Sequence, residues 1–377
     1  MSEVKQVKIT IDGKTIEVPE GTNILEAARK IGGDVTPVAL CYYSSLEGSG
    51  GRCRTCLMEV TKGSEKDPRP MPKLVASCRT AVQDGMEVKS MTSEKAVDAR
   101  DGVSEFLLVN HPLDCPVCDQ AGECHLQDMN YAQGNAGTRT TFVRRTFEPE
   151  DLGPYIQLNM NRCILCYRCV LVADQLTEER EHGVLDRGDH ARISTSINKA
   201  LTNDFIGNVI DVCPVGALTD KTFRFKQRVW FTKPLDAHRD CDKCCGEVRL
   251  WMRGEEVFRI TTRRDYWGEV KKDKDGNTAW ICNECRFHKK NASDWIIDGP
   301  SDINRHSVIS QGHYGVNDVG TAGKAEKLID KVLGMEPIYK LDIHDISEVN
   351  RPEIKLSKID GPAHSEDFDI DIKKIDK

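Results

Sequence analysis

The sequence has no long apolar run and no excess of basic residues. No stretch free of Asp, Glu, Lys and Arg reaches the roughly 20 apolar residues of a membrane-spanning helix. We therefore expect no transmembrane segment, and the polar first ten residues argue against a secretory signal. The 53 Lys and Arg against 60 Asp and Glu give a net charge of −7, without a basic block. Nucleic acid is therefore not an expected partner.

The sequence also lacks a convincing nucleotide-binding loop. Gly48–Gly51 does not follow the G-x-G-x-x-G pattern. Gly323-Lys324 lacks both the upstream glycine and the following Ser or Thr of a phosphate-binding loop. We expect no NADH, flavin or quinone site on this chain, and we assign no side chain as acid, base or nucleophile.

Cysteine, in contrast, is abundant. The chain has 16 cysteines in 377 residues, a lower share than the roughly 8–10% of disulfide-rich scaffolds. They are confined to residues 41–285 and form four tight groups. In a chain without an export signal, this pattern favours thiolate metal sites over disulfides.

The first cysteine group follows a predicted strand–strand–helix unit. Residues 5–18 alternate apolar and polar residues around an Asp12-Gly13 turn, and residues 24–31 have helical spacing. Further strands are predicted at 57–60 and 86–88. The group itself consists of Cys41, Cys53, Cys56 and Cys78.

This layout is similar to that of plant-type [2Fe–2S] ferredoxins, although their first spacing is shorter than C-x11-C. Gly48, Gly50 and Gly51 suit such a site, because residues without a side chain let backbone N–H groups approach anionic sulfur. The alternative is a four-cysteine zinc knuckle, which more often has two short pairs.

The second cysteine group follows a helix predicted over residues 93–110. It reads H-x3-C-x2-C-x5-C and consists of His111, Cys115, Cys118 and Cys124. Three thiolates can hold three corners of a [4Fe–4S] cube, and an imidazole would supply the fourth. His125, beside Cys124, is the alternative imidazole ligand.

The third cysteine group has the spacing of a two-cluster bacterial ferredoxin with one cluster deleted. Cys163, Cys166 and Cys169 form C-x2-C-x2-C, and Cys213-Pro214 matches the end of a second run. The other cluster's ligand positions hold no cysteine; they are Ala173, Asn203, Ile206 and Val209. We therefore predict one [4Fe–4S] cluster on Cys163, Cys166, Cys169 and Cys213.

The fourth cysteine group consists of two C-x2-C pairs, Cys241/Cys244 and Cys282/Cys285. Two such pairs suit structural Zn²⁺ at least as well as another [4Fe–4S] cluster, and the sequence leaves both open. Cys245 is the expected spare, because a ligand directly after Cys244 would point away from a shared centre.

Four cysteine-containing segments follow one another in an order that resembles the large iron–sulfur subunit of bacterial respiratory complex I. The segments are LEGSGGRCRTC, HPLDCPVCDQAGECHLQD, NRCILCYRCV and DVCPVGAL. The resemblance covers about residues 5–290. It implies an α+β chain with a β-grasp [2Fe–2S] domain, a small helical His–Cys segment, a ferredoxin-like [4Fe–4S] domain and a small β-rich cysteine domain. It also favours His111 over His125. The predicted boundaries are 1–92, 93–140, 141–222, 223–300 and, for an extended C-terminal arm, 301–377.

The resemblance further implies a function. Family members commonly continue into a long region similar to molybdopterin oxidoreductases, and this chain is expected to be a short form. The expected role is relay of single electrons within an NADH:quinone oxidoreductase and translocase, from a flavin/NADH-binding subunit toward quinone-reducing subunits. The implied order is the [2Fe–2S] site, the His-ligated centre and then the Cys163 centre. The expected location is cytoplasmic, on the inner face of the bacterial membrane, touching it only through partner subunits.

Two alternatives remain at this point. One is the iron–sulfur subunit of a soluble NAD-reducing hydrogenase or formate dehydrogenase. The other is a non-enzymatic scaffold or sensor that holds zinc throughout, which an iron analysis would distinguish.

Overall fold

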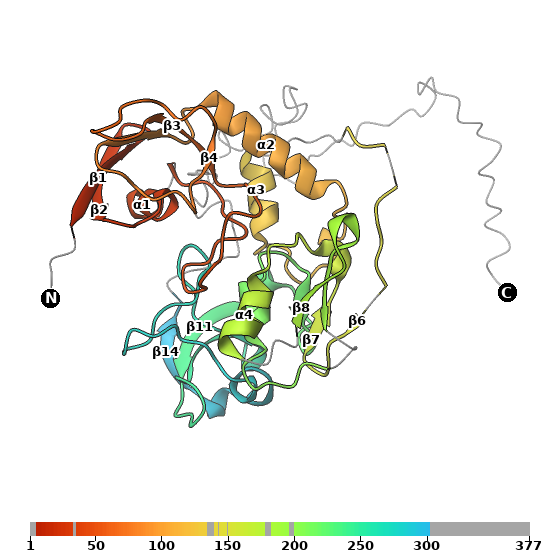
Figure 1. Cartoon of the computed structure of the whole chain (residues 1–377). Helices are drawn as coiled ribbons and strands as arrows, with labels where there is room; N and C mark the ends of the chain where they lie inside the picture. Colours follow the sequence, from red (N-terminus) through yellow and green to blue (C-terminus); the bar gives the residue numbers. More distant parts are fainter. Residues whose placement is uncertain are drawn as a thin grey trace, which may run out of the picture. The chain divides into compact units, whose positions relative to one another are not determined.

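The structure is a computed structural model, and it describes residues 5–32, 35–133, 139–141, 143–148, 150–177, 182–195 and 200–301 (Figure 1). These residues all lie within one unit, Met1–Gly334. Apart from Ser301, the predicted C-terminal arm lies outside the described residues. The described residues combine helices with mainly antiparallel sheets, which is the predicted α+β class.

The N-terminal sheet has the strand order β2-β1-β5-β3-β4. Its strands are β1 (Gln6–Ile11), β2 (Lys14–Pro19), β3 (Leu57–Lys62), β4 (Val75–Ala76) and β5 (Met86–Lys89). β1 and β2 form the predicted hairpin, whereas β1 and β5 run parallel. Helix α1 (Ile24–Ile31) begins where the Asn23 side chain accepts a hydrogen bond from the Glu26 backbone N–H. The buried face of α1 packs with the inner face of the sheet into one apolar core.

Helix α2 (Glu94–Leu108) follows, capped by Ser93, in agreement with the predicted helix. A 3₁₀ turn, η2 (Cys115–Val117), and helix α3 (His125–Gln133) complete the segment. The guanidinium of Arg100 in α2 donates to the carbonyls of Leu57 and Ser90, which ties this helix to the N-terminal sheet.

Among the described residues between 150 and 220, the chain forms two short helices and two small sheets. The helices are α4 (Arg168–Leu176) and α5 (Asn208–Val212). One sheet has the strand order β10-β7-β6. Its strands are β6 (Glu150–Asp151), β7 (Ile156–Leu158) and β10 (Leu218–Asp220). The other sheet is the antiparallel pair β8 (His182–Leu185) and β9 (Arg192–Thr195). The 3₁₀ turns are η3 (Met160–Arg162) and η4 (Gly188–His190).

The last described part is a four-stranded sheet of order β13-β12-β11-β14. Its strands are β11 (Lys233–His238), β12 (Glu247–Arg253), β13 (Glu256–Thr261) and β14 (Ile296–Pro300). Three short helical turns accompany the sheet: η6 (Val229–Phe231), η7 (Glu284–His288, a π-helix) and η8 (Ala292–Asp294). The β-rich character of residues 229–260 was predictable, but β14 was not, because its IIDGP sequence carries a glycine and a proline. In the part of the chain that the structure describes, every helix is too short or too polar to cross a bilayer.

Candidate metal centres

The first cysteine group lies in the loop between α1 and β3 and just after β4, with all four cysteines buried. The Sγ atoms of Cys56 and Cys78 lie 3.3 Å apart. Hydrogen bonds from Cys53 and Cys78, together with backbone N–H groups, lower the pKa of Cys41 to about 2. The same hydrogen bonds raise the pKa of Cys53 and Cys78, so the four thiols share their protons, and a bound cation would be needed to keep all four as the metal-binding thiolate.

The glycines of this loop allow the close approach of backbone to sulfur. The N–H of Gly51 donates to Cys78 Sγ at 3.3 Å, and the N–H groups of Arg52 and Cys53 donate to Cys41 Sγ at the same distance. Gly50 has φ +93°, and a Cβ there would lie 3.1 Å from Cys78 Sγ. A glycine is therefore needed at this position for both conformation and space.

The second cysteine group lies around η2 and the start of α3. Cys115 is exposed, Cys118 buried and Cys124 half-buried, and burial raises the pKa of Cys118 and Cys124. Burial, with the nearby Arg162, lowers the pKa of His111 to about 4. His111 is therefore neutral at neutral pH, which is the state in which an imidazole nitrogen can bind a metal.

The two candidate histidines differ in their surroundings. His111 lines a small pocket that also includes Cys163. His125 is buried in the first turn of α3, where its backbone N–H donates to the Pro214 carbonyl. The choice of His111 stays a prediction.

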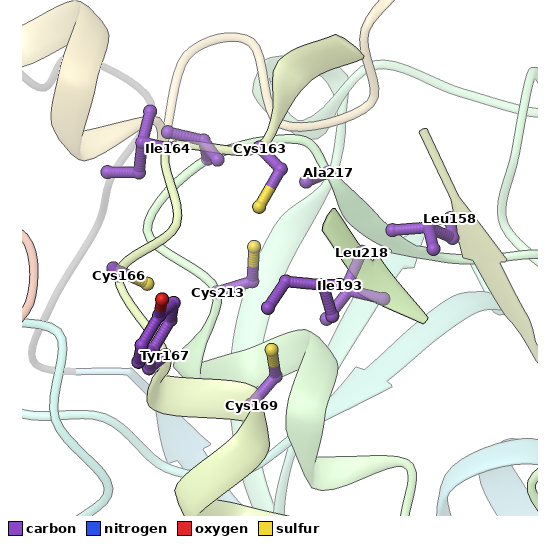
Figure 2. Close-up of a pocket in the computed structure, with 11 residues that line it drawn as sticks. Leu158, Cys163, Ile164, Cys166, Tyr167, Cys169, Ile193, Cys213, Ala217 and Leu218 are labelled. Atoms are coloured by element: carbon purple, nitrogen blue, oxygen red, sulfur yellow. The ribbon is translucent and has the colours of Figure 1, made fainter. Parts of the chain in front are cut away.

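The third cysteine group surrounds one cavity. Figure 2 shows the sulfur atoms of Cys163, Cys166, Cys169 and Cys213 turned toward a common space. The remaining lining is mostly apolar; it includes Leu158, Ile164, Ile193, Val215, Ala217 and Leu218. Burial raises the pKa of Cys166 to about 12 and raises that of the other three thiols as well. A bound cation is therefore what would keep these four sulfurs ionised.

The positions of the missing second cluster are occupied by packed side chains. Ala173, Ile206 and Val209 are almost fully buried and belong to the apolar core that also contains the third cysteine group. The carbonyl of Asn203 accepts a hydrogen bond from the Asn283 side chain at 2.9 Å. The positions at which the sequence pattern indicated a lost cluster are thus occupied by apolar core side chains and a hydrogen bond.

The fourth cysteine group is brought together by the last sheet. The four Sγ atoms of Cys241, Cys244, Cys282 and Cys285 all lie within 4.8 Å of one another. The expected spare thiol, that of Cys245, instead donates to the Trp280 carbonyl at 3.8 Å. All 16 cysteines are among the described residues, and all are free, so the structure has no disulfide among them.

Arg168 joins the first and third cysteine groups. It lies between Cys166 and Cys169, and its guanidinium donates to the carbonyls of Ala39 at 2.7 Å and Tyr42 at 2.5 Å, on either side of Cys41. It also donates to the Val212 carbonyl, next to Cys213, at 3.4 Å. Sequence reasoning missed this residue, although an arginine between two cysteines of a predicted buried cluster site was a usable signal, because charged side chains are rarely buried without partners.

The third group also touches the second. Cys213 is followed by Pro214, whose carbonyl accepts hydrogen bonds from the His125 N–H and the Cys124 thiol. A Cβ on Gly216 would collide with Cys118 Sγ. The third group therefore has direct links to both others, through Arg168 to the loop of Cys41 and through Pro214 and Gly216 to the second group.

A buried ion pair fixes the second group to the last sheet. The Arg259 guanidinium of β13 donates to both carboxylate oxygens of Glu123, at 2.5 and 3.1 Å, and Arg264 lies 3.6 Å from the same carboxylate. Glu123 directly precedes Cys124. The Arg259 partner lies 136 residues away along the chain, so spacing alone could not have revealed the pair.

Three family models match successive parts of the chain. Residues 4–93 match a 2Fe-2S iron-sulfur cluster binding domain, and residues 100–139 match the NADH-ubiquinone oxidoreductase-G iron-sulfur binding region. Residues 153–219 match the ferredoxin-like domain of NADH-quinone oxidoreductase subunit 3.

Curated relatives carry related names. The mitochondrial NADH dehydrogenase (ubiquinone) iron-sulfur protein 1 of Solanum tuberosum is 41% identical, over 74% of this chain and 35% of the relative. The chain is a homologue of the large iron–sulfur subunit of complex I. The mitochondrial 78 kDa subunit of NADH-ubiquinone oxidoreductase of Neurospora crassa is 42% identical, over 75% and 36%. A bacterial relative, from the NADH-quinone oxidoreductase of Rickettsia bellii, is 38% identical, over 78% and 40%.

This complex I homologue thus spans 35–40% of the length of these three relatives. Among solved structures, a crystal structure of NAD+-reducing [NiFe]-hydrogenase in the H2-reduced state is similar at 27% identity and a TM-score of 0.49. That overlap covers 59% of this chain and 91% of the other.

Proposed function

We propose that this chain is an electron-transfer subunit of an NADH:quinone oxidoreductase. It would relay single electrons from a flavin-containing subunit toward the subunits that reduce quinone. The observation that carries the proposal is the continuity of three cysteine groups, joined by Arg168 and by the Pro214–Gly216 loop, over residues that match iron–sulfur family models.

The ligand sets follow from these groups. One [2Fe–2S] cluster would be held by Cys41, Cys53, Cys56 and Cys78. Two [4Fe–4S] clusters would be held by His111, Cys115, Cys118 and Cys124, and by Cys163, Cys166, Cys169 and Cys213. Such clusters supply one-electron redox chemistry, and the protein sets its rate and direction through ligand identity, hydrogen bonds and burial.

The order of transfer follows from the contacts. Arg168 links the loop of Cys41 to the third cysteine group, and Gly216 brings the third group against Cys118. We therefore infer the sequence [2Fe–2S] site, Cys163 centre, His111 centre. A neutral imidazole in place of an anionic thiolate favours the reduced state, which suits a later acceptor.

The partners would be the flavin/NADH-binding subunit and other subunits of the hydrophilic arm. We place the chain on the cytoplasmic side of the bacterial membrane, in contact with it only through partner subunits. Purification of the intact complex tests this point, because co-purification with membrane subunits separates this assembly from a soluble NAD-reducing one.

The decisive experiment is Cys213→Ala in the intact complex, reduced without oxygen and examined by electron paramagnetic resonance. The expected result is loss of one [4Fe–4S] signal while the [2Fe–2S] signal remains. Cys245→Ala is the matched control and should keep both signals, because its thiol bonds to the Trp280 carbonyl. If Cys213→Ala keeps every signal, the proposed ligand set is wrong; if the wild type contains no iron, the electron-transfer role is wrong as well.

A further inference from the structure

The fourth cysteine group has the spacing of ligands around one ion. Cys241 Sγ and Cys282 Sγ lie 3.8 Å apart, and Cys244 Sγ lies 3.6 Å from Cys282 Sγ and 3.8 Å from Cys285 Sγ. A disulfide is excluded by these distances, since its sulfurs are bonded at about 2.05 Å.

These distances match the edge of a zinc–thiolate tetrahedron. With Zn–S bonds of about 2.3 Å, the sulfurs of a regular tetrahedron lie about 3.8 Å apart. In a [4Fe–4S] cube, each thiolate binds a different iron, so the four sulfurs must be spread more widely around the cluster. Among the described residues, this group alone has all its ligand atoms within 4.8 Å, and the third cysteine group does not meet that limit.

We propose that Cys241, Cys244, Cys282 and Cys285 bind a single structural Zn²⁺ ion. The proposal is independent of the electron-transfer role, because zinc has no redox chemistry. Four cysteine ligands leave no open coordination position, as is typical of structural rather than catalytic zinc.

The surroundings of the site suit an anionic tetrathiolate centre. The guanidinium of Arg239 donates to Cys285 Sγ at 3.7 Å, and the backbone N–H of Cys285 donates to Cys282 Sγ at 3.5 Å. A cationic side chain and a backbone donor around the sulfurs offset the excess negative charge of four thiolates on one divalent ion.

The backbone of the site has one close approach that holds the first pair in place. Gly246 has φ +67°, and a Cβ there would overlap the Arg239 carbonyl oxygen. The Gly246 carbonyl accepts a hydrogen bond from the Arg239 N–H. The turn that carries Cys241 and Cys244 is thus closed at its base by β11 and β12.

The second pair connects the ion to the ferredoxin-like part. Asn283, between Cys282 and Cys285, accepts from the Gly207 N–H at 3.1 Å and donates to the Asn203 carbonyl. The next residue after Cys285 is Arg286, which pairs with Asp211 of α5 at 2.5 Å. The zinc ion would therefore fix a turn that supports α5, the helix that leads to Cys213.

The test is metal analysis of the full chain purified within its complex. We expect a single zinc ion per chain in addition to the cluster iron, and X-ray absorption at the zinc edge should show four sulfur neighbours at about 2.3 Å. Cys282→Ser should lose the zinc, whereas Cys245→Ser, the matched control, should retain it.

The wild-type measurement does not depend on whether Cys282→Ser folds. Iron at the fourth group, either as a further [4Fe–4S] signal or as a single ion, would overturn the proposal, as would zinc-free protein with four titratable thiols. Absence of the [2Fe–2S] and [4Fe–4S] signals with zinc present would refute the proposed function and leave this inference standing.

Discussion

Gly216 lies directly against the sulfur of Cys118. A Cβ at residue 216 would overlap Cys118 Sγ, and its other near neighbours would be side-chain atoms of Gln120 and Arg162. The backbone that follows Cys213 therefore passes beside a sulfur of the second cysteine group. This approach brings two proposed cluster sites together through one short stretch of chain, 213–216.

Gly216→Ala should disturb the His–Cys centre selectively. The added methyl group must displace Cys118 Sγ or the loop, and overpacking of this kind costs roughly 1–3 kcal/mol. We expect loss or distortion of one [4Fe–4S] resonance with an unchanged [2Fe–2S] resonance. Gly183→Ala is the control, because a Cβ there has no neighbour within 4 Å in the described residues. Equal spectra for the two variants would contradict the close approach.

Arg168→Lys should slow transfer between the first and third cysteine groups. A lysine cannot bond the carbonyls of Ala39, Tyr42 and Val212 together, because it lacks the planar fork of arginine. Each lost bond to a charged donor costs about 1.5–3 kcal/mol. We expect both cluster signals to persist while NADH-driven quinone reduction falls severalfold. Arg253→Lys, at an exposed position of β12, should behave as wild type.

Glu123→Gln should destabilise the protein strongly. It leaves Arg259, which is buried, without its bidentate carboxylate, and breaking a buried pair costs about 3–5 kcal/mol. Calorimetry without oxygen should therefore record a melting temperature lower by roughly 10 °C. The matched variant Glu255→Gln, in the exposed β12–β13 turn, should melt at nearly the wild-type temperature. An unchanged melting temperature for Glu123→Gln would show that the pair adds nothing.

His182 should make the stability of the fold fall in mild acid. It is buried in β8, its two ring nitrogens have no hydrogen-bond partner among the described residues, and burial lowers its pKa from 6.5 to about 4. Between pH 6.5 and about pH 4, the imidazole of His182 binds a proton in the unfolded chain but not in the folded chain. The free energy of unfolding is therefore highest above pH 6.5, and the contribution of the neutral His182 to it is lost as the pH falls toward 4.

Between about pH 7.5 and pH 5.5 this difference amounts to about 1.3 kcal/mol of unfolding free energy. His182→Phe should remove that part of the pH dependence, whereas His190→Phe, at an exposed site, should keep it. Chemical unfolding at the two pH values measures the effect. If the free energy of unfolding changes equally with pH in both variants, His182 takes up its proton over the same pH range in the folded chain as in the unfolded chain.

Local patterns predicted the secondary structure of the N-terminal part and the β-rich character of residues 229–260, but not α3, α4, α5 or β6–β10. The β1–β2 hairpin, α1 and α2 follow from alternation, helical spacing and caps within a few residues, so their signals lie in the sequence itself. Spacing also indicated which cysteines gather, since a metal site takes several ligands from one loop. The ligand sets and the five domain boundaries remain predictions.

Long-range partners could not be predicted in this way. Arg259 meets Glu123, and Arg29 meets Glu269 at 2.7 Å, because separate parts of the chain pack together, and no periodicity marks such pairs. The relay order could not be read from the sequence for the same reason, because it depends on which groups touch, and the contacts of Arg168 and Gly216 join distant parts of the chain. The strand β14 was missed because it is specified by pairing with β11 rather than by its own residues.

The filled position of the lost cluster would limit where charge can travel from the proposed Cys163 centre. At the positions of the lost cluster, the buried side chains of Ile206 and Val209 belong to the apolar core that also contains the third cysteine group. On that side, the Asn203–Asn283 hydrogen bond leads to the fourth cysteine group, where the proposed zinc ion would have no redox chemistry. If both proposals hold, an electron at the Cys163 centre would therefore have no redox-active acceptor on that side, and its path would be restricted to the first and second groups.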